Sequence, residues 1–380
     1  MLRQYHIKNY DFKLILLVGA LTFIGIMTIG SANSEFQSNQ IMGLTMGLFT
    51  MVIVSLIDYS FILKFSWLIY AANLALLILV ATSLGESTNN SQRWINIMGI
   101  RFQPSELTKI ILILFFAQFI MIHKNQISKF KYILLSIILL LPPLLLVLKQ
   151  PDLSTSIMIA VIFCVLMFVG GLEKRIVISI VSILIPAVII FLILVVQEDQ
   201  TLIEDYQRLR IMAWLYPDEY SNSTAYQQLN SIMAIGSGML FGKGYKNNEI
   251  TSVKNGNFIS EPQTDFIFAI VGEEFGFIGT CGVIILILMI VLECISVARK
   301  AKDLAGTLIA MGVAALIGFQ SFLNISVATG VLPNTGIPLP FVSYGLSSLL
   351  SLYIGVGLVL NVRLQGNSRK YATNQRGLEL

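Results

Sequence analysis

Acidic residues beside a long apolar run are the groups in this sequence with the clearest potential for chemistry. The stretch "EPQTDFIFAIVGEEFGFIG" at 261–279 places Asp265 at the start of such a run, with Glu273 and Glu274 further along it. Ionisable groups at membrane depth cost on the order of 2.5–3.5 kcal/mol each, so they usually face a cavity and mark function. The simpler alternative for Asp265 is a helix cap or first-turn residue. The adjacent glutamates need partners, for which Lys109 and the arginines are candidates.

A second group of ionisable residues lies in "RWINIMGIRFQPSELTK" at 93–109. Ser105 is expected to be the N-cap of a helix, in an imperfect capping box with Thr108 at the third position. Glu106 and Lys109 share a helix face, which favours a structural ion pair between them. Lys109 could also direct its cation into an outward cavity. The candidate site residues of this stretch are Arg93, Arg101, Gln103, Ser105, Glu106 and Lys109.

Three further stretches carry polar or conformationally unusual residues. "KQPDLSTS" at 149–156 contains Asp152, for which a helix cap and a site residue are equally good interpretations. "IGSGMLFGKG" at 235–244 contains Lys243; its glycines permit close approach to a ligand, although a flexible turn is the simpler reading. "VLPNTGIPLPFVSYGLSS" at 331–348 carries three prolines, together with Ser343 and Tyr344. Such a rigid non-helical segment is tolerated in a membrane only when it is buried in protein or lines a cavity.

The composition indicates what must position these residues. The chain of 380 residues is 56% hydrophobic and 12% charged, with a mean hydropathy of +0.79, which is typical of an integral membrane protein. A membrane span needs about 20 apolar residues, and uninterrupted runs of that length favour helices. We therefore predict one all-α polytopic domain over 1–380. About ten spans are expected, at 13–31, 40–57, 61–83, 105–122, 131–148, 154–171, 175–196, 268–297, 304–328 and 341–362.

The distribution of lysine and arginine predicts the orientation of the spans. Every inner turn of the ten-span arrangement is basic, whereas the short outer loops carry only Arg93, Arg101 and Lys149. The positive-inside rule then places both termini in the cytoplasm. Two outer loops are long, 84–104 and 197–263, and the second lies between the seventh and eighth spans. Within it, helical spacing of apolar residues predicts an amphipathic helix through Leu202, Tyr206, Leu209, Ala213 and Tyr216.

Composition also argues against several functions. The net charge is +4 and the basic residues are scattered, so binding to nucleic acid is not expected. Cys164, Cys281 and Cys294 fall in apolar runs and are expected to be small buried residues rather than disulfide partners or metal ligands. The two histidines, His6 and His123, lie near the expected cytoplasmic side, so a catalytic histidine is improbable. No organic cofactor is expected.

Taken in order along the chain, these stretches resemble the SEDS family (shape, elongation, division and sporulation) of polytopic peptidoglycan polymerases. "TGIPLPF" and "SEPQTDFIF" are more similar to its elongation (RodA-like) branch than to its division (FtsW-like) branch. Gly345-Leu346 departs from the family's Gly-Gly, and Met239 replaces a common glycine. The motifs are "RWI" at 93–95, "FQPSELTK" at 102–109, "QPDLSTS" at 150–156, "IGSGMLFGKG" at 235–244, "TDFIFAIVGEEFGFIG" at 264–279 and "GIPLPFVSYGLSS" at 336–348.

The resemblance implies a glycosyltransferase that joins lipid II units into β-1,4 glycan strands at the outer face of the bacterial cytoplasmic membrane. Asp265 matches the family's catalytic aspartate and is expected to act as the base. Inversion at the sugar carbon needs a base and stabilisation of the departing pyrophosphate, but no enzyme nucleophile. Cations for the pyrophosphate are expected from the matched motifs, with Arg93, Arg101 and Lys109 favoured over Arg208, Arg210 and Lys243.

The resemblance also implies partners and a metal. Family members work with a class B penicillin-binding protein, a transpeptidase, so contacts with it, with the nascent glycan strand and with membrane lipid are expected. A divalent cation, Mg²⁺ or Mn²⁺, is expected to assist; Asp265, Asp152 or Glu106 could supply oxygen ligands, although no spacing defines a metal site. The competing interpretations are a flippase or transporter of the lipid-linked precursor, and a non-enzymatic scaffold for cell-wall enzymes.

Overall fold

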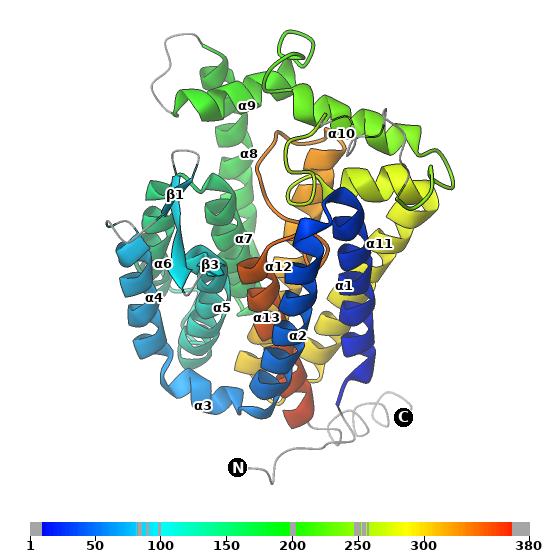
Figure 1. Cartoon of the computed structure of the whole chain (residues 1–380). Helices are drawn as coiled ribbons and strands as arrows, with labels where there is room; N and C mark the ends of the chain where they lie inside the picture. Colours follow the sequence, from blue (N-terminus) through cyan, green and yellow to red (C-terminus); the bar gives the residue numbers. More distant parts are fainter. Residues whose placement is uncertain are drawn as a thin grey trace, which may run out of the picture.

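The computed structural model shows a bundle of helices with a small sheet and two short helices at one end (Figure 1). It describes residues 10–80, 82, 86–88, 91–97, 100–197, 203–246, 252, 256 and 258–366. The bundle helices are α1 (Phe12–Ala32), α2 (Glu35–Leu56), α3 (Tyr59–Lys64), α4 (Ser66–Val80), α5 (Pro104–Ile122), α6 (Phe130–Lys149), α7 (Leu153–Val169), α8 (Lys174–Val196), α11 (Ile267–Arg299), α12 (Leu304–Ala328) and α13 (Leu346–Gln365). The end structures are β1 (Glu86–Thr88), β2 (Ser91–Ile97), β3 (Ile100–Phe102), α9 (Asp205–Leu215) and α10 (Tyr226–Ser237).

The prediction of a helical membrane protein is confirmed. Seven of the described helices are long and apolar enough to cross a membrane: α1, α2, α5, α6, α11, α12 and α13. The other three expected spans also coincide with helices, namely 61–83 with α3 and α4, 154–171 with α7, and 175–196 with α8. The total of ten spans and the inside placement of the termini remain predictions. Helix α1 begins and α13 ends at the same end of the bundle, opposite the sheet and α9, as that topology requires (Figure 1).

The predictions for the outer loops and the last span were partly wrong. Residues 84–104, expected to be a loop, contain a three-stranded antiparallel sheet in the order β1-β2-β3, with Asn96 opposite Arg101. The last span was expected from 341 but begins at Leu346, because the preceding residues continue the proline-rich segment. The helix expected in the large loop is confirmed as α9, but its predicted apolar face is not: Ala213 is buried, whereas Tyr206, Leu209 and Tyr216 are exposed. Leu202, His6 and the terminal residues 1–9 and 367–380 lie outside the described residues.

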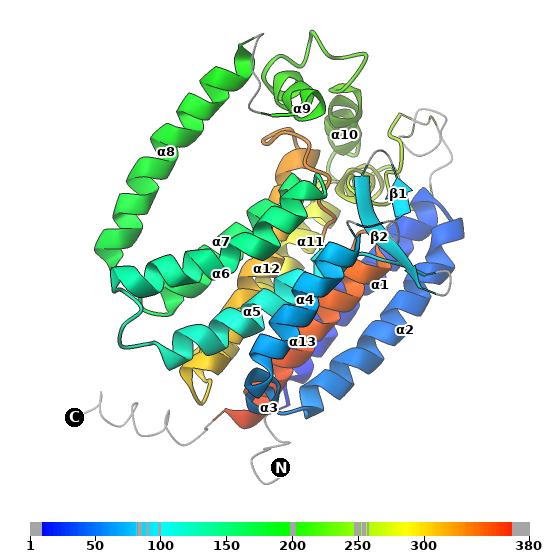
Figure 2. The same cartoon turned by 90° about the vertical axis from the view of Figure 1, so that its left-hand side faces the viewer.

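Helices α5, α12 and α13 form the centre of the bundle. Helix α13 packs against α2, α5 and α12, while α12 also packs against α11 and α7. Most of the residues of α13 and α12 are buried, including Tyr353, whose hydroxyl hydrogen-bonds Thr22 of α1 at 2.9 Å. Helix α8 lies at the edge of the molecule, away from these central helices (Figure 2). The buried ends of α5, α12 and α13 therefore form the scaffold for polar residues at the sheet end.

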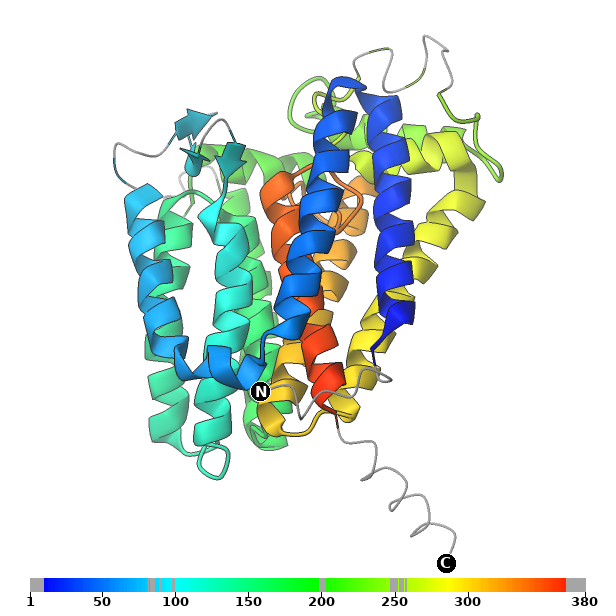
Figure 3. The same cartoon turned by 60° about the horizontal axis from the view of Figure 1, so that its bottom comes forward.

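Helix α11 is bent near its start, at the same end of the bundle as the sheet (Figure 3). Gly276 has φ 63° and ψ −159°, a backbone conformation open mainly to glycine. The bend exposes main-chain groups that the glycine-rich turn after α10 satisfies: Lys243 N donates to Glu273 O at 2.9 Å, and Phe277 N donates to Met239 O at 2.8 Å. The turn at 235–244 is thus packed main chain to main chain on α11, rather than a flexible connection.

Candidate active site

Asp265 lies just outside the first turn of α11. The N-cap of that helix is Phe266, which makes no side-chain capping bond, so the interpretation of Asp265 as a helix cap is wrong. Among the residues that the structure describes, no hydrogen bond to the Asp265 carboxylate is found, and its side chain is partly exposed. A partly buried carboxylate without such a structural partner is available for chemistry.

The main chain at Asp265 is held from behind by α12. The Asn324 side-chain amide donates to Asp265 O at 2.8 Å and to Ile337 O at 2.7 Å, so it ties the start of α11 to the proline-rich segment. Gly336 of that segment has φ 70°, and a Cβ there would lie 3.3 Å from Asp265 Oδ2. The proline-rich segment therefore forms one wall beside the carboxylate, as its rigidity suggests.

Ser343 and Tyr344 hold the main chain next to Asp265, and the contact of both residues with substrate stays a prediction. The Ser343 hydroxyl donates to Thr264 O at 2.6 Å and accepts from Leu339 N at 2.7 Å. Tyr344 N donates to Gln263 O at 2.9 Å. These bonds connect the residues immediately before Asp265 to the segment that precedes α13. Their visible role is to fix where the carboxylate stands.

Burial governs the protonation of Asp265. Desolvation by burial raises the pKa of the Asp265 carboxyl from 3.8 to about 6; the Arg210 guanidinium opposes this most strongly, followed by Arg93. The nearby carboxylates of Glu261 and Asp152 add smaller raising effects. Burial therefore outweighs the cations. A general base is most effective when its pKa lies near the working pH, and this environment provides that.

Arg210 reaches this site from α9, in the large outer loop. Its guanidinium is 3.5 Å from Asn334 O in the proline-rich segment and is the nearest strong positive influence on Asp265. By contrast, Arg208 donates to Val195 O at 3.1 Å and Val196 O at 3.3 Å, so it binds the last carbonyls of α8. Sequence reasoning named both arginines but favoured other cations. The sequence did contain one indication that Arg210 faces the protein: it lies three residues before Ala213, on the same face of the predicted helix.

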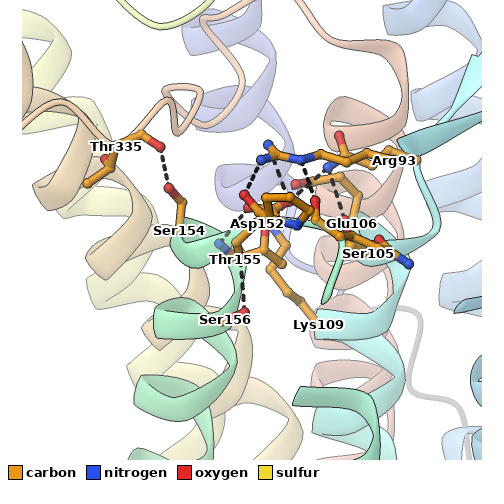
Figure 4. Close-up of polar contacts among 12 residues, drawn as sticks. Arg93, Ser105, Glu106, Lys109, Asp152, Ser154, Thr155, Ser156 and Thr335 are labelled. Atoms are coloured by element: carbon orange, nitrogen blue, oxygen red, sulfur yellow. Dashed lines mark hydrogen bonds and ion pairs between the residues drawn. The ribbon is translucent and has the colours of Figure 1, made fainter. Parts of the chain in front are cut away.

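Asp152 is both a helix cap and a member of a polar network (Figure 4). Its Oδ1 accepts from Thr155 N at 3.1 Å, which confirms the capping interpretation for α7. Its Oδ2 accepts from Thr155 Oγ1 at 2.9 Å and from Gln103 Nε2 at 3.2 Å, and lies 4.0 Å from Arg93. Gln103 Nε2 also donates to Ser105 Oγ at 3.0 Å. Asp152 thus joins the starts of α5 and α7.

Arg93 is fixed at the edge of this network. Its Nε donates to Gln150 O at 2.9 Å, and its Nη2 donates to Pro151 O. The side chain remains 27% exposed, so the guanidinium is held in place yet still faces outward. A guanidinium has five N–H donors, and these contacts leave capacity for an anion.

Glu106 and Lys109 form the predicted ion pair, and it is deeply buried (Figure 4). Lys109 Nζ lies 3.0 Å from Glu106 Oε1 and also donates to Gln320 Oε1 at 3.0 Å. The Gln320 amide in turn donates to Pro338 O at 3.0 Å. The pair therefore braces α5 and α12 against the proline-rich segment. The structure shows Lys109 in this bracing contact rather than facing an open cavity.

The capping prediction for α5 was wrong. The helix begins one residue earlier, at Pro104, and its N-cap is Gln103, which makes no side-chain capping bond. Proline is favoured at the first helical position because its missing N–H needs no partner there. Ser105 consequently lies inside the first turn and accepts the bond from Gln103 instead of capping.

The remaining candidates, Arg101 and Lys243, occupy other places at the outer end. Arg101 in β3 is exposed, and its carbonyl accepts from Ser347 Oγ at 3.2 Å. Lys243 pairs with Glu273 at 2.9 Å, and the other oxygen of Glu273 accepts from Ser252 Oγ at 3.1 Å. The cation beside Glu273 is thus Lys243, and not Lys109 or an arginine as expected. No contact of the described residues joins Lys243 to Asp265.

The side chains suggested as metal ligands do not assemble into a metal centre. Within the described ranges, no three His, Cys, Asp or Glu residues gather closely enough to hold an ion. The oxygens of Asp152 are engaged by Thr155, Gln103 and Arg93, and Glu106 is neutralised by Lys109. The protein residues described here therefore do not fit a protein-held divalent cation.

Comparisons with known proteins place the chain in a family. The family model described as a cell cycle protein family, FtsW/RodA/SpoVE, matches residues 5–368. The chain is 34% identical over 375 residues to a probable peptidoglycan glycosyltransferase FtsW of Geobacter sulfurreducens, covering 95% of this chain and 97% of the relative. It is 32% identical over 361 residues to the peptidoglycan glycosyltransferase MrdB of Escherichia coli strain K12, covering 93% of each.

Solved structures show the same fold. One chain of a structure described as structural coordination of polymerization and crosslinking by a peptidoglycan synthase complex superposes with a TM-score of 0.77 at 28% identity, covering 93% of this chain and 97% of that one. The crystal structure of Thermus thermophilus rod shape determining protein RodA gives a TM-score of 0.68 at 27% identity, covering 93% and 96%. Relatives named for both branches match, so the comparisons do not separate RodA-like from FtsW-like. The chain therefore belongs to the FtsW/RodA/SpoVE family of cell cycle proteins, the SEDS family that its motifs resemble.

Proposed function

We propose that this protein is a peptidoglycan glycosyltransferase that polymerises lipid II into β-1,4 glycan strands at the outer face of the cytoplasmic membrane. The relatives named as peptidoglycan glycosyltransferases, which align over nearly the whole chain, support the activity. The observation that carries the mechanism is the Asp265 carboxylate. It stands at the start of a membrane helix, its pKa is raised to about 6, and cations flank it. A lipid-linked sugar would present its polar end to Asp265 at this depth, where the membrane helix begins.

The chemistry needs one carboxylate. The 4-hydroxyl oxygen of the acceptor sugar attacks the anomeric carbon of the donor, and Asp265 accepts the hydroxyl proton as the new C–O bond forms. The bond between the anomeric carbon and the pyrophosphate oxygen breaks at the same time, and undecaprenyl pyrophosphate leaves with the electron pair. One in-line displacement converts an α-linkage into a β-linkage, so no covalent enzyme intermediate is required.

The departing pyrophosphate needs positive charge in a poorly hydrated site. Arg210 and Arg93 are the cations with the strongest influence on Asp265, and both guanidiniums are held by main-chain carbonyls at the outer end. Pre-oriented arginines suit a pyrophosphate because their planar fork binds two oxygens at once. We assign them to the leaving group. Lys109 supports the site through its bracing pair, and Arg101 remains a predicted contact for the substrate.

A transpeptidase partner follows from the same proposal. The likeness to a chain of a peptidoglycan synthase complex, in which polymerization and crosslinking are coordinated, supports association with a class B penicillin-binding protein. The strand made here would be the substrate for that partner. Apolar side chains on the outside of the bundle, such as Phe49 and Ile183, provide surface for lipid and for a partner's membrane anchor.

A flippase is the competing function, since charged groups inside a membrane protein also suit a transport path. Arg93 in β2, Arg210 in α9 and Asp152 all act electrostatically on Asp265. Strand β2 and helix α9 lie at one end of the bundle (Figure 1), whereas carriers usually bind their substrates near the bilayer midplane. This one-sided arrangement favours polymerisation over transport.

The deciding experiment is polymerisation of purified lipid II by the full-length protein and by Asp265→Asn. We expect glycan strands from the wild type and none from the variant. The matched control is Asp218→Asn, the same chemical change on an exposed residue after α9, which should leave strand synthesis intact. Normal synthesis by Asp265→Asn would refute the assigned base. Absence of strands from the wild type in the presence and absence of the transpeptidase would favour the flippase or the scaffold.

A further inference from the structure

A cavity lies at the end of the bundle opposite to Asp265. It measures about 150 Å³ and is formed where α4, α5 and α6 meet. These three helices lie side by side in all three views (Figures 1–3). The cavity lies toward the end at which α1 begins and α13 ends, which the distribution of basic residues predicts to be cytoplasmic.

The walls of this α4–α6 cavity are aromatic and apolar. Phe115 stacks on Tyr70 with ring centroids 4.4 Å apart, and Trp67 meets Phe115 edge-on at 4.9 Å. Trp67 and Ile122 also line the cavity, although they are 59% and 62% exposed. Because the outer surface of these helices faces lipid, the cavity opens sideways into the bilayer. A space of this kind suits part of an acyl chain.

Two hydrogen-bond acceptors in the cavity wall point to a ligand with donor groups such as hydroxyls. The Gln118 amide makes no hydrogen bond with any described residue, and its Oε1 is enclosed. Such a group is unfavourable in hydrocarbon, where no water can satisfy it. His123 lies nearer than Gln118 to the predicted membrane surface, and its Nδ1 contacts Phe119 O at 2.9 Å. With Nδ1 as the donor in that bond, Nε2 remains available to a ligand.

Three lysines lie close in the sequence to residues that line or border the cavity. Lys64 lies two residues before Ser66 in the cavity wall, Lys124 follows His123 directly, and Lys131 precedes Tyr132, whose ring is 4.8 Å from that of His123. All three lysines are exposed, and the turn at 123–130 contains no acidic residue. Basic pockets between helices on the cytoplasmic side are suited to anionic lipid head groups.

From these observations we propose that the α4–α6 cavity binds an anionic glycerophospholipid from the leaflet at that end. One acyl chain occupies the aromatic space between Trp67 and Phe119. The enclosed Gln118 Oε1 accepts from a hydroxyl of the glycerol head group, and Lys124, Lys131 and Lys64 surround the phosphate. The site is separate from the glycosyl-transfer site, so it neither requires nor tests the proposed polymerisation.

The test uses the fluorescence of Trp67. The other two tryptophans, Trp94 and Trp214, lie in β2 and α9 at the opposite end, so Trp67 is the reporter closest to this site. The full-length protein is placed in nanodiscs of phosphatidylcholine with increasing mole fractions of phosphatidylglycerol, and only one of the two lipids carries bromine on its acyl chains. Brominated phosphatidylglycerol should quench Trp67 at a lower mole fraction than brominated phosphatidylcholine.

Two variants separate this site from general lipid contact. Lys124→Gln should raise the mole fraction for half-maximal quenching about fivefold, since each lysine beside an anionic lipid contributes roughly that factor. The matched control Lys174→Gln, an exposed lysine at the same end but at the start of α8, should leave it unchanged. Leu139→Phe fills the cavity, so the two brominated lipids should then quench Trp67 at the same mole fraction.

Equal quenching by the two brominated lipids in the wild type would overturn the proposal. The proposal would also be overturned if Lys124→Gln and Lys174→Gln raised the mole fraction for half-maximal quenching equally, because that would indicate only a diffuse surface charge. Circular dichroism and gel filtration establish that each variant is folded. If Leu139→Phe does not fold, the comparison of the two surface lysines alone still decides the question.

Discussion

The Asp265→Asn variant offers a joint test of stability and activity. Burial raises the pKa of Asp265 from 3.8 to about 6, so the folded protein favours the protonated carboxyl more than the unfolded chain does. Each pKa unit corresponds to about 1.4 kcal/mol, which gives a cost of up to about 3 kcal/mol for holding the ionised group in the fold. Partial exposure of the side chain reduces this figure, so about 1–3 kcal/mol is expected.

The sign of the pH dependence follows from the raised pKa. The cost is fully present above about pH 6, declines as the pH falls from 6 toward 4, and vanishes below the unfolded pKa. Asparagine carries no charge at any of these values. Asp265→Asn should therefore raise the apparent melting temperature by a few degrees at pH 8, and by about half as much at pH 5. Strand synthesis should be lost at both.

Thermal unfolding in detergent, followed by intrinsic fluorescence at the two pH values, measures the first effect, and lipid II polymerisation measures the second. For the wild type, kcat/KM should fall about tenfold per pH unit below about 6, because the base must be ionised. A variant less stable than the wild type at pH 8 would show that the carboxylate is a structural group. A variant that still makes strands would show that it is not the base.

Four further predictions follow from the geometry. Arg210→Ala should lower kcat for strand synthesis by about 10²–10³-fold with little change in melting temperature, and a normal kcat would remove Arg210 from the leaving-group site. Lys109→Met should destabilise the fold by about 3–5 kcal/mol because Glu106 is left buried and unpaired, and adding Glu106→Gln should restore much of the loss in thermal unfolding. Met239 has φ 50°, so Met239→Gly should gain about 1 kcal/mol in stability; a loss would mean that the exposed side chain contributes packing. Since the described residues do not form a metal centre, chelation by EDTA should leave the melting temperature unchanged, and any loss of synthesis would be restored by Mg²⁺ or Mn²⁺ binding with the pyrophosphate.

Local features were predicted well from the sequence. The expected spans agree with the helices to within a few residues because each is an uninterrupted apolar run with polar ends. The Glu106–Lys109 pair and the cap formed by Asp152 were also predictable, since the spacing along one helix brings their atoms together. In both features the interacting residues are less than two helical turns apart in the sequence.

The missed features depend on contacts between distant segments. The pairing of Lys243 with Glu273 follows from the bend at Gly276, which no periodic pattern reveals. The influence of Arg210 on Asp265 requires α9 to fold back over the start of α11. The sheet at 86–102 was missed because its strands are short and lie between spans, where hydrophobic periodicity is weak. The sequence named candidate residues, while tertiary packing determined which of them meet.

The bend in α11 has a mechanical consequence for the enzyme. Both sides of the bend are fastened to the turn after α10: Glu273 O and Glu274 O accept main-chain bonds from it, and Phe277 N and Ile278 N donate to it. After these bonds the helix continues in a different direction. A membrane-crossing segment tilts when the thickness of the surrounding lipid changes. Because these bonds hold the bend on both sides, tilting is confined to the part of the helix after Ile278 and is kept from the short segment next to Asp265. The height of the Asp265 carboxylate over the lipid is then set by the protein's outer cap, and glycosyl transfer keeps its alignment across bilayers of different thickness.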